Sequence, residues 1–378
     1  MRPKFEEGGK LYTFHSLFDA MDTFFYTPEQ TTVSGCHIRD AVDNKRTMFT
    51  VVIALIPALL FGMYNIGYQH YLSLGQVSCY CDNFWGNLGY GFLKILPMLL
   101  VSYIVGLGIE CIFAQIRKHE VSEGYFVTGM LIPLICPPDV PLWQLAIAVA
   151  FAVIIGKEVF GGTGYNFLNP ALVARAFLFF SYPSQMSGDN VWIAEQGDAI
   201  SGATPLGEML AGGITPHASA LEMFLGFIPG SVGETSVVAI LIGAVILLVT
   251  GIASWRIMLS IFAGGAAMGL VFNMIGANPY MEMPFYYHFL IGGFMFGAVF
   301  MATDPVTAAQ TNIGKYIYGA LIGIMAVLIR VLNPAYPEGM MLSILLLNVF
   351  APLIDYYVVE ANIRRRAKRT KLLAKNNQ

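Results

Sequence analysis

Two stretches decide the fold, "GMLIPLICPPDVP" at 129–141 and "GGFMFGAVFMATDPVT" at 292–307. Each is an apolar run containing glycine that stops where proline and aspartate occur together. Because proline lacks an N–H group and breaks a helix, each run predicts a helix that ends early. At membrane depth such a break is tolerated only where protein or a cavity covers the freed backbone. The two stretches therefore predict a membrane protein built around a pair of broken helices.

The composition agrees with a membrane location. Of the 378 residues, 56% are hydrophobic and 12% are charged, whereas soluble domains carry roughly 25% charged residues. The gaps between charges match the roughly 20 apolar residues that cross a bilayer. No secretory signal is expected, because the N-terminal stretch before the first apolar run is too polar. Hydrophobicity predicts about ten spans, at 48–66, 88–113, 124–136, 141–158, 167–182, 236–253, 257–275, 286–302, 316–332 and 339–357.

The two broken runs indicate an internal repeat. They fall in the third and eighth predicted spans, which are five spans apart. Because successive spans cross the membrane in alternating directions, an odd separation gives the two runs opposite orientations. Inverted repeats place functional sites between broken helices near the membrane midplane. We therefore expect an all-α polytopic fold with an inverted repeat of five plus five helices, 48–182 and 236–357, similar to the architecture of urea and ammonium channels. A cytoplasmic segment at 1–47, an outer loop at 183–235 and a basic tail at 358–378 complete the expected organisation.

Lysine and arginine predict the orientation. All but three of the 21 basic residues lie at the termini or in loops on one side, and the opposite loops contain none. Cytoplasmic loops carry this excess in membrane proteins. We expect both termini in the cytoplasm and the loop 183–235 on the opposite side, facing the periplasm or the exterior.

Before the first span, apolar residues recur at helical spacing. They are Leu11, Phe14, Leu17, Phe18, Met21, Phe24 and Phe25. The pattern predicts an amphipathic helix that lies on the membrane or packs on a partner.

Cys79 and Cys81 form a Cys-x-Cys in a predicted outer loop. The pair fits two free thiols or a local disulfide. The alternative is a metal site shared with a partner subunit.

Three of the acidic residues in or beside predicted spans are candidates for function. Glu110 and Asp355 fall near the cytoplasmic edge, and Asp304 lies at the second helix break beside Thr303 and Thr307. Intramembrane acids are costly and usually functional, and carboxylates with hydroxyls suit a hard cation such as Na⁺. Each acid also has a structural alternative. Glu110 and Asp355 could extend their side chains to the membrane–water interface, and Asp304 could cap a helix.

The stretch "GKEVFGGTGYNFLNPALVARAF" at 156–177 contains a glycine turn that lacks the features of a P-loop or Rossmann turn. Asn166 and Asn169 follow it, and an asparagine amide can cap a helix or bind the edge of a planar heterocycle. Arg175 lies two turns into the next span. A buried guanidinium there requires an anion or a cluster of carbonyls.

The outer loop contains "SGATPL" at 201–206. Thr204 fits a helix N-cap and Pro205 the first helical position. A hydroxyl there lies beside free N–H groups, which suit a phosphate. Ser201, Gly202 and Ala203 are small enough to let a bulky group approach the backbone.

"SGATPL" resembles the Ser/Asp-Gly-x-Thr motif at which FMN is attached, through its phosphate, to threonine. The family is the B subunit of the sodium-translocating NADH:quinone oxidoreductase, with the D subunit of the Rnf complex as a sister. The resemblance extends over nearly the whole chain, through "HIRDAVDNKRTM", "FGMYNIGYQ", "IRKHEVSEGYFVTGMLIPLICPPDVPLWQ", "MATDPVTA" and "NVFAPLIDYYVVEANIRRR". The N-terminal segment with "HIRDAVDNKR" favours the sodium-translocating enzyme over Rnf.

The resemblance implies the site roles. Thr204 would carry covalent FMN, with Ser201, Gly202 and Ala203 as its motif neighbours. Asn166 and Asn169 would bind riboflavin. Ubiquinone or menaquinone would be reduced near Arg39, Asp40 and Gly106, and the Na⁺ path would include Glu110 and Asp355. The sequence departs from the family at Gly106-Leu107-Gly108, where the family has a Gly-Gly pair, which puts a quinone contact at position 107 in doubt.

The resemblance also implies a location, the inner membrane of a bacterium, and it implies partners. They are other subunits of a respiratory complex, including an NADH-oxidising flavoprotein and a second covalent-FMN subunit, and no nucleic acid. An Rnf-type subunit, a flavin-free small-solute channel and a structural scaffold are the alternatives.

Overall fold

The computed structural model describes residues 18, 32, 34–36, 44–77, 79–80, 82–117, 124–189, 191–195, 202–210, 218–333 and 338–376. In this part of the chain the regular structure is helical, without strands. The first half contains α2 (Asn44–Ser73), α3 (Phe84–Arg117), α4 (Tyr125–Leu134), α5 (Leu142–Gly156), η3 (Glu158–Phe160) and α6 (Pro170–Ser181). The second half contains α10 (Val237–Val249), α11 (Trp255–Ile275), α13 (Tyr287–Leu290), α14 (Phe294–Phe296), η4 (Gly297–Met301), α15 (Asn312–Leu332) and α16 (Met340–Asn376). The connecting segments contain α7 (Pro183–Met186), α8 (Pro205–Leu210), α9 (Ala220–Leu225) and α12 (Pro279–Glu282).

The described residues form a multi-pass membrane protein. Six helical segments are long and apolar enough to cross a bilayer. They are Lys45–Ser73, Phe84–Arg117, Leu142–Phe160, Trp255–Ile275, Asn312–Leu332 and Met340–Thr370. The prediction of ten spans is met only in part, because α4, α6 and α10 are apolar but shorter than a full crossing, and the eighth predicted span is divided among α13, α14 and η4.

Both predicted helix breaks are present. α4 ends at Leu134, one residue after Pro133. The chain between α9 and α10 covers this end, since the N–H of Gly233 donates to the carbonyl oxygen of Leu134 at 2.7 Å. The second run ends its helix at Met301, before Asp304 and Pro305, as predicted. The run is also interrupted at its start, after α13, where Gly292 has a φ of +67° that favours glycine. We call this interruption the second break. The chain then continues as the short α14 and the π-helix η4.

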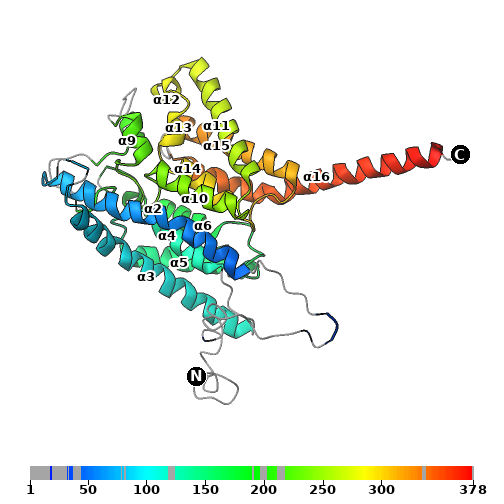
Figure 1. Ribbon diagram of the computed structural model, residues 1–378, viewed down its shortest axis with the longest axis horizontal. Coiled ribbons are helices and arrows are strands. Elements are labelled where there is room, and N and C mark those ends of the chain that lie inside the picture. Colours follow the sequence, from blue (N-terminus) through cyan, green and yellow to red (C-terminus); the bar gives the residue numbers. More distant parts are fainter. Residues whose placement is uncertain are drawn as a thin grey trace, which may run out of the picture.

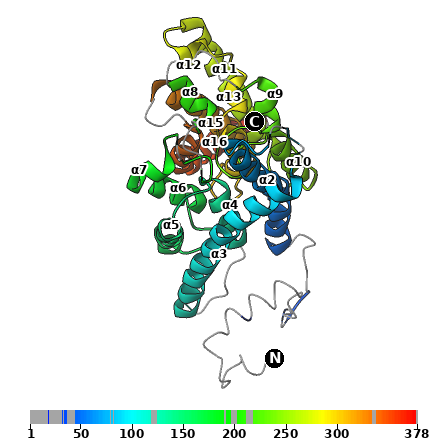
Figure 2. The same ribbon diagram turned by 90° about the vertical axis from the view of Figure 1, so that its left-hand side faces the viewer.

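α2 packs along α3 and also contacts α10 from the second half, and α2 and α3 lie side by side in both views (Figures 1 and 2). α16 extends far beyond the bundle to the C-terminus (Figure 1). The last span was predicted to end at residue 357, but the helix continues through the basic run to Asn376. The expected N-terminal amphipathic helix lies outside the described residues apart from Phe18, which is helical.

Glycines allow α11 and α15 to approach closely. A Cβ atom at Gly264 would overlap the carbonyl oxygen of Ala320, and one at Gly323 would overlap that of Ile261. Small residues at helix interfaces give membrane helices the close packing that drives their association. This pair of helices is therefore fixed by backbone contact.

We expect Gly323→Ala to destabilise the protein, because overpacking costs about 1–3 kcal/mol. The control is Gly89→Ala on α3, where a Cβ atom would meet nothing within 4 Å. Alanine in an open helical position gains about 0.5–1 kcal/mol over glycine, so the two variants should shift the unfolding midpoint in detergent in opposite directions. Equal midpoints would contradict the packing account.

Candidate functional site

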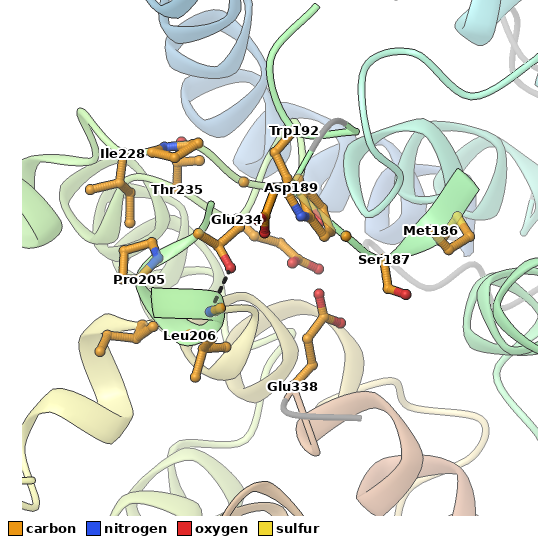
Figure 3. Close-up of a pocket in the computed structure, with 18 of the residues that line it drawn as sticks. Met186, Ser187, Asp189, Trp192, Pro205, Leu206, Ile228, Glu234, Thr235 and Glu338 are labelled. Atoms are coloured by element: carbon orange, nitrogen blue, oxygen red, sulfur yellow. Dashed lines mark hydrogen bonds between the residues drawn. The ribbon is translucent and has the colours of Figure 1, made fainter. Parts of the chain in front are cut away.

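A cavity of about 460 Å³ lies beside Thr204. Its wall is formed by α6, the segment after α7, the start of α8, residues 228–235, the second helix break and Glu338. Asp189, Trp192, Glu234 and Glu338 approach it from different elements, and the carboxylates of Glu234 and Glu338 point toward one another (Figure 3). The cavity therefore combines groups that are far apart in the sequence.

Thr204 is a helix cap, as its sequence context predicts. Its Oγ1 accepts a hydrogen bond from the N–H of Gly207 at 3.2 Å, and its carbonyl oxygen accepts from the N–H of Glu208 at 2.9 Å. The residue is partly exposed, while Gly202 is buried and Ala203 partly buried. Ser201 lies outside the described residues. The hydroxyl of Thr204 is thus oriented by α8 at the edge of the cavity.

Arg175 forms the centre of a buried charge cluster on the cavity wall. Its guanidinium donates to Oε1 of Glu234 at 2.7 Å, to Oε2 of Glu338, to Oγ of Ser231 at 3.4 Å and to the carbonyl oxygen of Ile135. The prediction that this arginine requires an anion or carbonyls is confirmed, because it has both. Ile135 directly follows α4, so the cluster also satisfies backbone freed at the first break.

A second buried arginine satisfies the other break. Arg330 donates to the carbonyl oxygens of His288 at 2.7 Å and Ile291 at 3.1 Å. It also donates to the carbonyl oxygen of Glu338 at 3.3 Å. Glu338 therefore contacts Arg175 through its side chain and Arg330 through its backbone, and connects the two breaks.

Burial affects the acids of this cluster unequally. The side chain of Glu234 is 4% exposed and that of Glu338 is 17% exposed. Burial raises the pKa of Glu234, which precedes α10, above its ordinary range, and the neighbouring Arg175 opposes this shift. Water therefore screens the carboxylate of Glu338 more than that of Glu234.

A second, smaller cavity of about 70 Å³ is lined by Asn166, Asn169, Asp304, Thr303 and Lys157. Asn169 caps α6, since its Oδ1 accepts from the N–H of Ala171 at 3.0 Å. Its Nδ2 donates to Oδ2 of Asp304 at 3.3 Å. Three residues that the sequence singled out separately are thus brought together.

Asn166 and Asp304 are held by their own loops. Oδ1 of Asn166 accepts from the N–H of Gly164 at 3.3 Å, and Nδ2 donates to the carbonyl oxygen of Leu168 at 3.0 Å. Asp304 accepts from the N–H of Val306 and from Oγ1 of Thr307, both at 3.1 Å. These bonds fix the polar side chains of the smaller cavity and orient their remaining donors and acceptors.

Glu110 is buried, which contradicts the alternative that its side chain reaches the membrane interface. Its carboxylate forms an ion pair with Lys157, which is also buried. Lys157 lies 5.9 Å from the ring centre of Tyr125. A Cβ atom at Gly106 would overlap Tyr125, so this glycine makes room for the ring.

Asp355 is separate from both cavities. Its carboxylate accepts from the N–H groups of Gln310 at 2.6 Å and Thr311 at 3.0 Å, before the start of α15. Arg39 and Asp40 lie outside the described residues. The structure therefore gives no contact among the predicted quinone residues.

Cys79 is an exposed free thiol, and Cys81 lies outside the described residues. Among the residues that are described, no group of three or more metal-binding side chains occurs. The neighbouring Tyr80 donates to Oε1 of Glu222 at 2.8 Å, and this hydrogen bond raises the pKa of Tyr80 to about 12. The contact fastens the loop to α9.

Comparisons with known proteins identify the family. The model of the NQR2, RnfD, RnfE family matches residues 31–364. The chain belongs to this family. Among similar proteins, the B subunit of the Na(+)-translocating NADH-quinone reductase of Ectopseudomonas mendocina is 51% identical, with 97% of this chain and 96% of the relative covered. The protein of the same name from Chromohalobacter salexigens is 50% identical, with 98% of this chain and 95% of the relative covered. The one from Azotobacter vinelandii is 49% identical, with 97% of this chain and 96% of the relative covered.

The family resemblance named Thr204 but gave no reason to select Asp189, Trp192, Glu234, Glu338 or Arg330. A weak signal exists for three of them. Arg330 lies inside a predicted span, and Glu234 and Glu338 each stand just before one. Intramembrane charges of this kind usually have partners, but the sequence does not identify them.

We expect Lys157→Met to destabilise the protein by about 3–5 kcal/mol, because it leaves the buried carboxylate of Glu110 without this cation. Adding Glu110→Gln should restore most of the loss. Chemical unfolding of the purified protein in detergent measures both effects.

Arg364→Met removes an exposed ion pair with Glu360 on α16. This control should cost less than about 1 kcal/mol. A single Lys157→Met variant as stable as this control would show that the buried pair has no structural role.

Proposed function

We propose that this chain is a membrane subunit of a sodium-translocating NADH-quinone reductase and that Thr204 carries FMN as a phosphate ester. The observation that supports this most strongly is the cavity of about 460 Å³ beside the Thr204 hydroxyl, in a chain about half identical to proteins named as the B subunit of that enzyme.

The residues of the cavity fit such a group. The volume falls within the roughly 300–1,000 Å³ of ligand pockets. Thr235 lines the cavity, and its buried Oγ1 has no hydrogen-bond partner. Buried polar atoms are normally paired, so this hydroxyl is available to a polar ligand. Trp192 offers an aromatic face for a planar ring.

A flavin at this position would supply the electron-transfer chemistry, and the protein would supply binding and electrostatics. Thr204 would provide the ester oxygen. It is partly exposed, so the hydroxyl is accessible for modification. The hydrogen bond from Gly207 uses one of its acceptor positions and leaves the oxygen oriented by α8.

The resemblance extends the proposal to a second flavin and to quinone. Asn166 and Asn169 would bind riboflavin, and Arg39, Asp40 and Gly106 would lie near ubiquinone or menaquinone. The smaller cavity of about 70 Å³ is below the size of typical ligand pockets. Riboflavin binding there would require the loop at 161–168 or the segment at 302–307 to move outward.

The cation path would use Glu110, Asp304 and Asp355. Asp304 is the best placed of the three, because it lines the smaller cavity with Thr303 and the two asparagines. Adding an electron to a group in a low-dielectric layer creates a charge that a nearby cation offsets. This attraction is the proposed coupling between electron transfer and Na⁺ movement.

We further propose that the fold is an inverted repeat. In the first half α3 packs on α5, and α5 on α6; in the second, α11 packs on α15, and α15 on α16. This correspondence supports two equivalent halves, each with a broken third element. Together with the basic loops it supports an inner-membrane orientation with both termini cytoplasmic and Thr204 periplasmic.

Within the family, the Rnf-type subunit is the alternative assignment, since the family model includes both types. Relatives near 50% identity along almost the full chain favour the NADH-quinone reductase. Its partners would include an NADH-oxidising flavoprotein and a second subunit with covalent FMN.

We expect Thr204→Val to abolish covalent flavin, because valine keeps the shape of threonine and removes the ester oxygen. Thr204→Ser should retain it. Loss of the N-cap costs about 0.5–2 kcal/mol, so the valine variant should still assemble. Flavin fluorescence of the denatured protein band is the measurement, with Thr250→Val as control. A fluorescent Thr204→Val band would refute the attachment site.

We expect Asp304→Asn to raise the Na⁺ concentration needed for half-maximal quinone reduction by about tenfold or more, since each 1.4 kcal/mol of lost binding is tenfold. Glu360→Gln on the cytoplasmic end of α16 should leave it unchanged. Activity measured against Na⁺ concentration tests this, and an unchanged requirement in Asp304→Asn would remove this residue from the path.

A further inference from the structure

The wall of the larger cavity carries an unusual balance of charge. Asp189, Glu234 and Glu338 line it together with one guanidinium, that of Arg175. Both terminal nitrogens of Arg175 already donate to acceptors, which include the two glutamates. A phosphate placed against Arg175 would therefore also face carboxylates.

This balance predicts the direction in which a ligand attached to Thr204 enters the cavity. A phosphate ester is anionic, and like charges at short distance in a low dielectric repel strongly. The ester bond keeps the phosphate at Thr204, a partly exposed residue at the edge of the cavity. The uncharged ring system is favoured on the inner wall, beside the unpartnered Thr235 hydroxyl and the Trp192 ring.

We propose that Arg175 and Glu338 set the reduction potential of the flavin carried by Thr204, because its ring system lies against them on the inner wall of the cavity. This inference rests on the proposed attachment of FMN. Arg175 is 3% exposed and the Glu338 side chain 17% exposed, so water screens their charges little. A negative neighbour opposes the addition of an electron, and a positive neighbour favours it.

The test is a redox titration of the purified complex followed by flavin absorbance. The transition missing from Thr204→Val identifies the flavin in question. Glu338→Gln should move its midpoint potential to more positive values, and Arg175→Gln to more negative values. A general loosening of the cavity would not produce shifts of opposite sign.

Three further variants calibrate the shifts. Asp189→Asn removes an exposed charge on the same cavity and should give a smaller positive shift than Glu338→Gln, since water screens it. Glu360→Gln lies on α16, outside the residues that line the cavity, and should give none. Arg175→Lys keeps the charge and should stay close to the unaltered potential.

Flavin fluorescence of the denatured band is measured for every variant, so that two failures can be separated. Absence of flavin from the unaltered chain would overturn the proposed function, and this inference with it. Flavin present with equal potentials in Glu338→Gln, Asp189→Asn and Glu360→Gln would overturn the inference alone. If Arg175→Gln fails to assemble, the sign and order of the shifts in the acidic variants decide the question.

Discussion

Backbone groups freed where a helix breaks must find hydrogen-bond partners without bulk water, and the structure is organised by this requirement. At the first break, Arg175 and the N–H of Gly233 donate to the carbonyls that end α4. At the second, Arg330 donates to the carbonyls of His288 and Ile291. Both arginines are buried and need anions or further carbonyls, and Glu338 contacts them both.

The same requirement explains why cavities lie beside the breaks. A helix that stops early leaves space beyond its end. The polar side chains that form hydrogen bonds with the unpaired backbone groups there line that space. The larger cavity has Arg175, Glu234 and Glu338 on its wall. The smaller one has Asp304, whose carboxylate follows η4 and accepts from Asn169. The side chains that pair with the freed backbone groups or lie beside them thus also line the cavities.

The sequence predicted the local features well. The prolines of "CPPDVP" indicated an early end of α4, the Asn-Pro pair at 169–170 indicated the start of α6, and the Thr-Pro pair at 204–205 indicated that of α8. It did not predict which charges meet, because Glu338 lies 163 residues from Arg175 and Lys157 lies 47 from Glu110. Such contacts depend on the packing of whole helices, and so do the two cavity volumes.

The central claim is that the hydroxyl of Thr204, held at the edge of the larger cavity, is the attachment point of a flavin. Mass spectrometry of the unaltered protein, first intact and then as fragments, tests it most directly. The account predicts a mass gain equal to FMN less one water, located on the fragment that contains Thr204. A chain with its unmodified mass, or a gain located on another residue, would contradict the account.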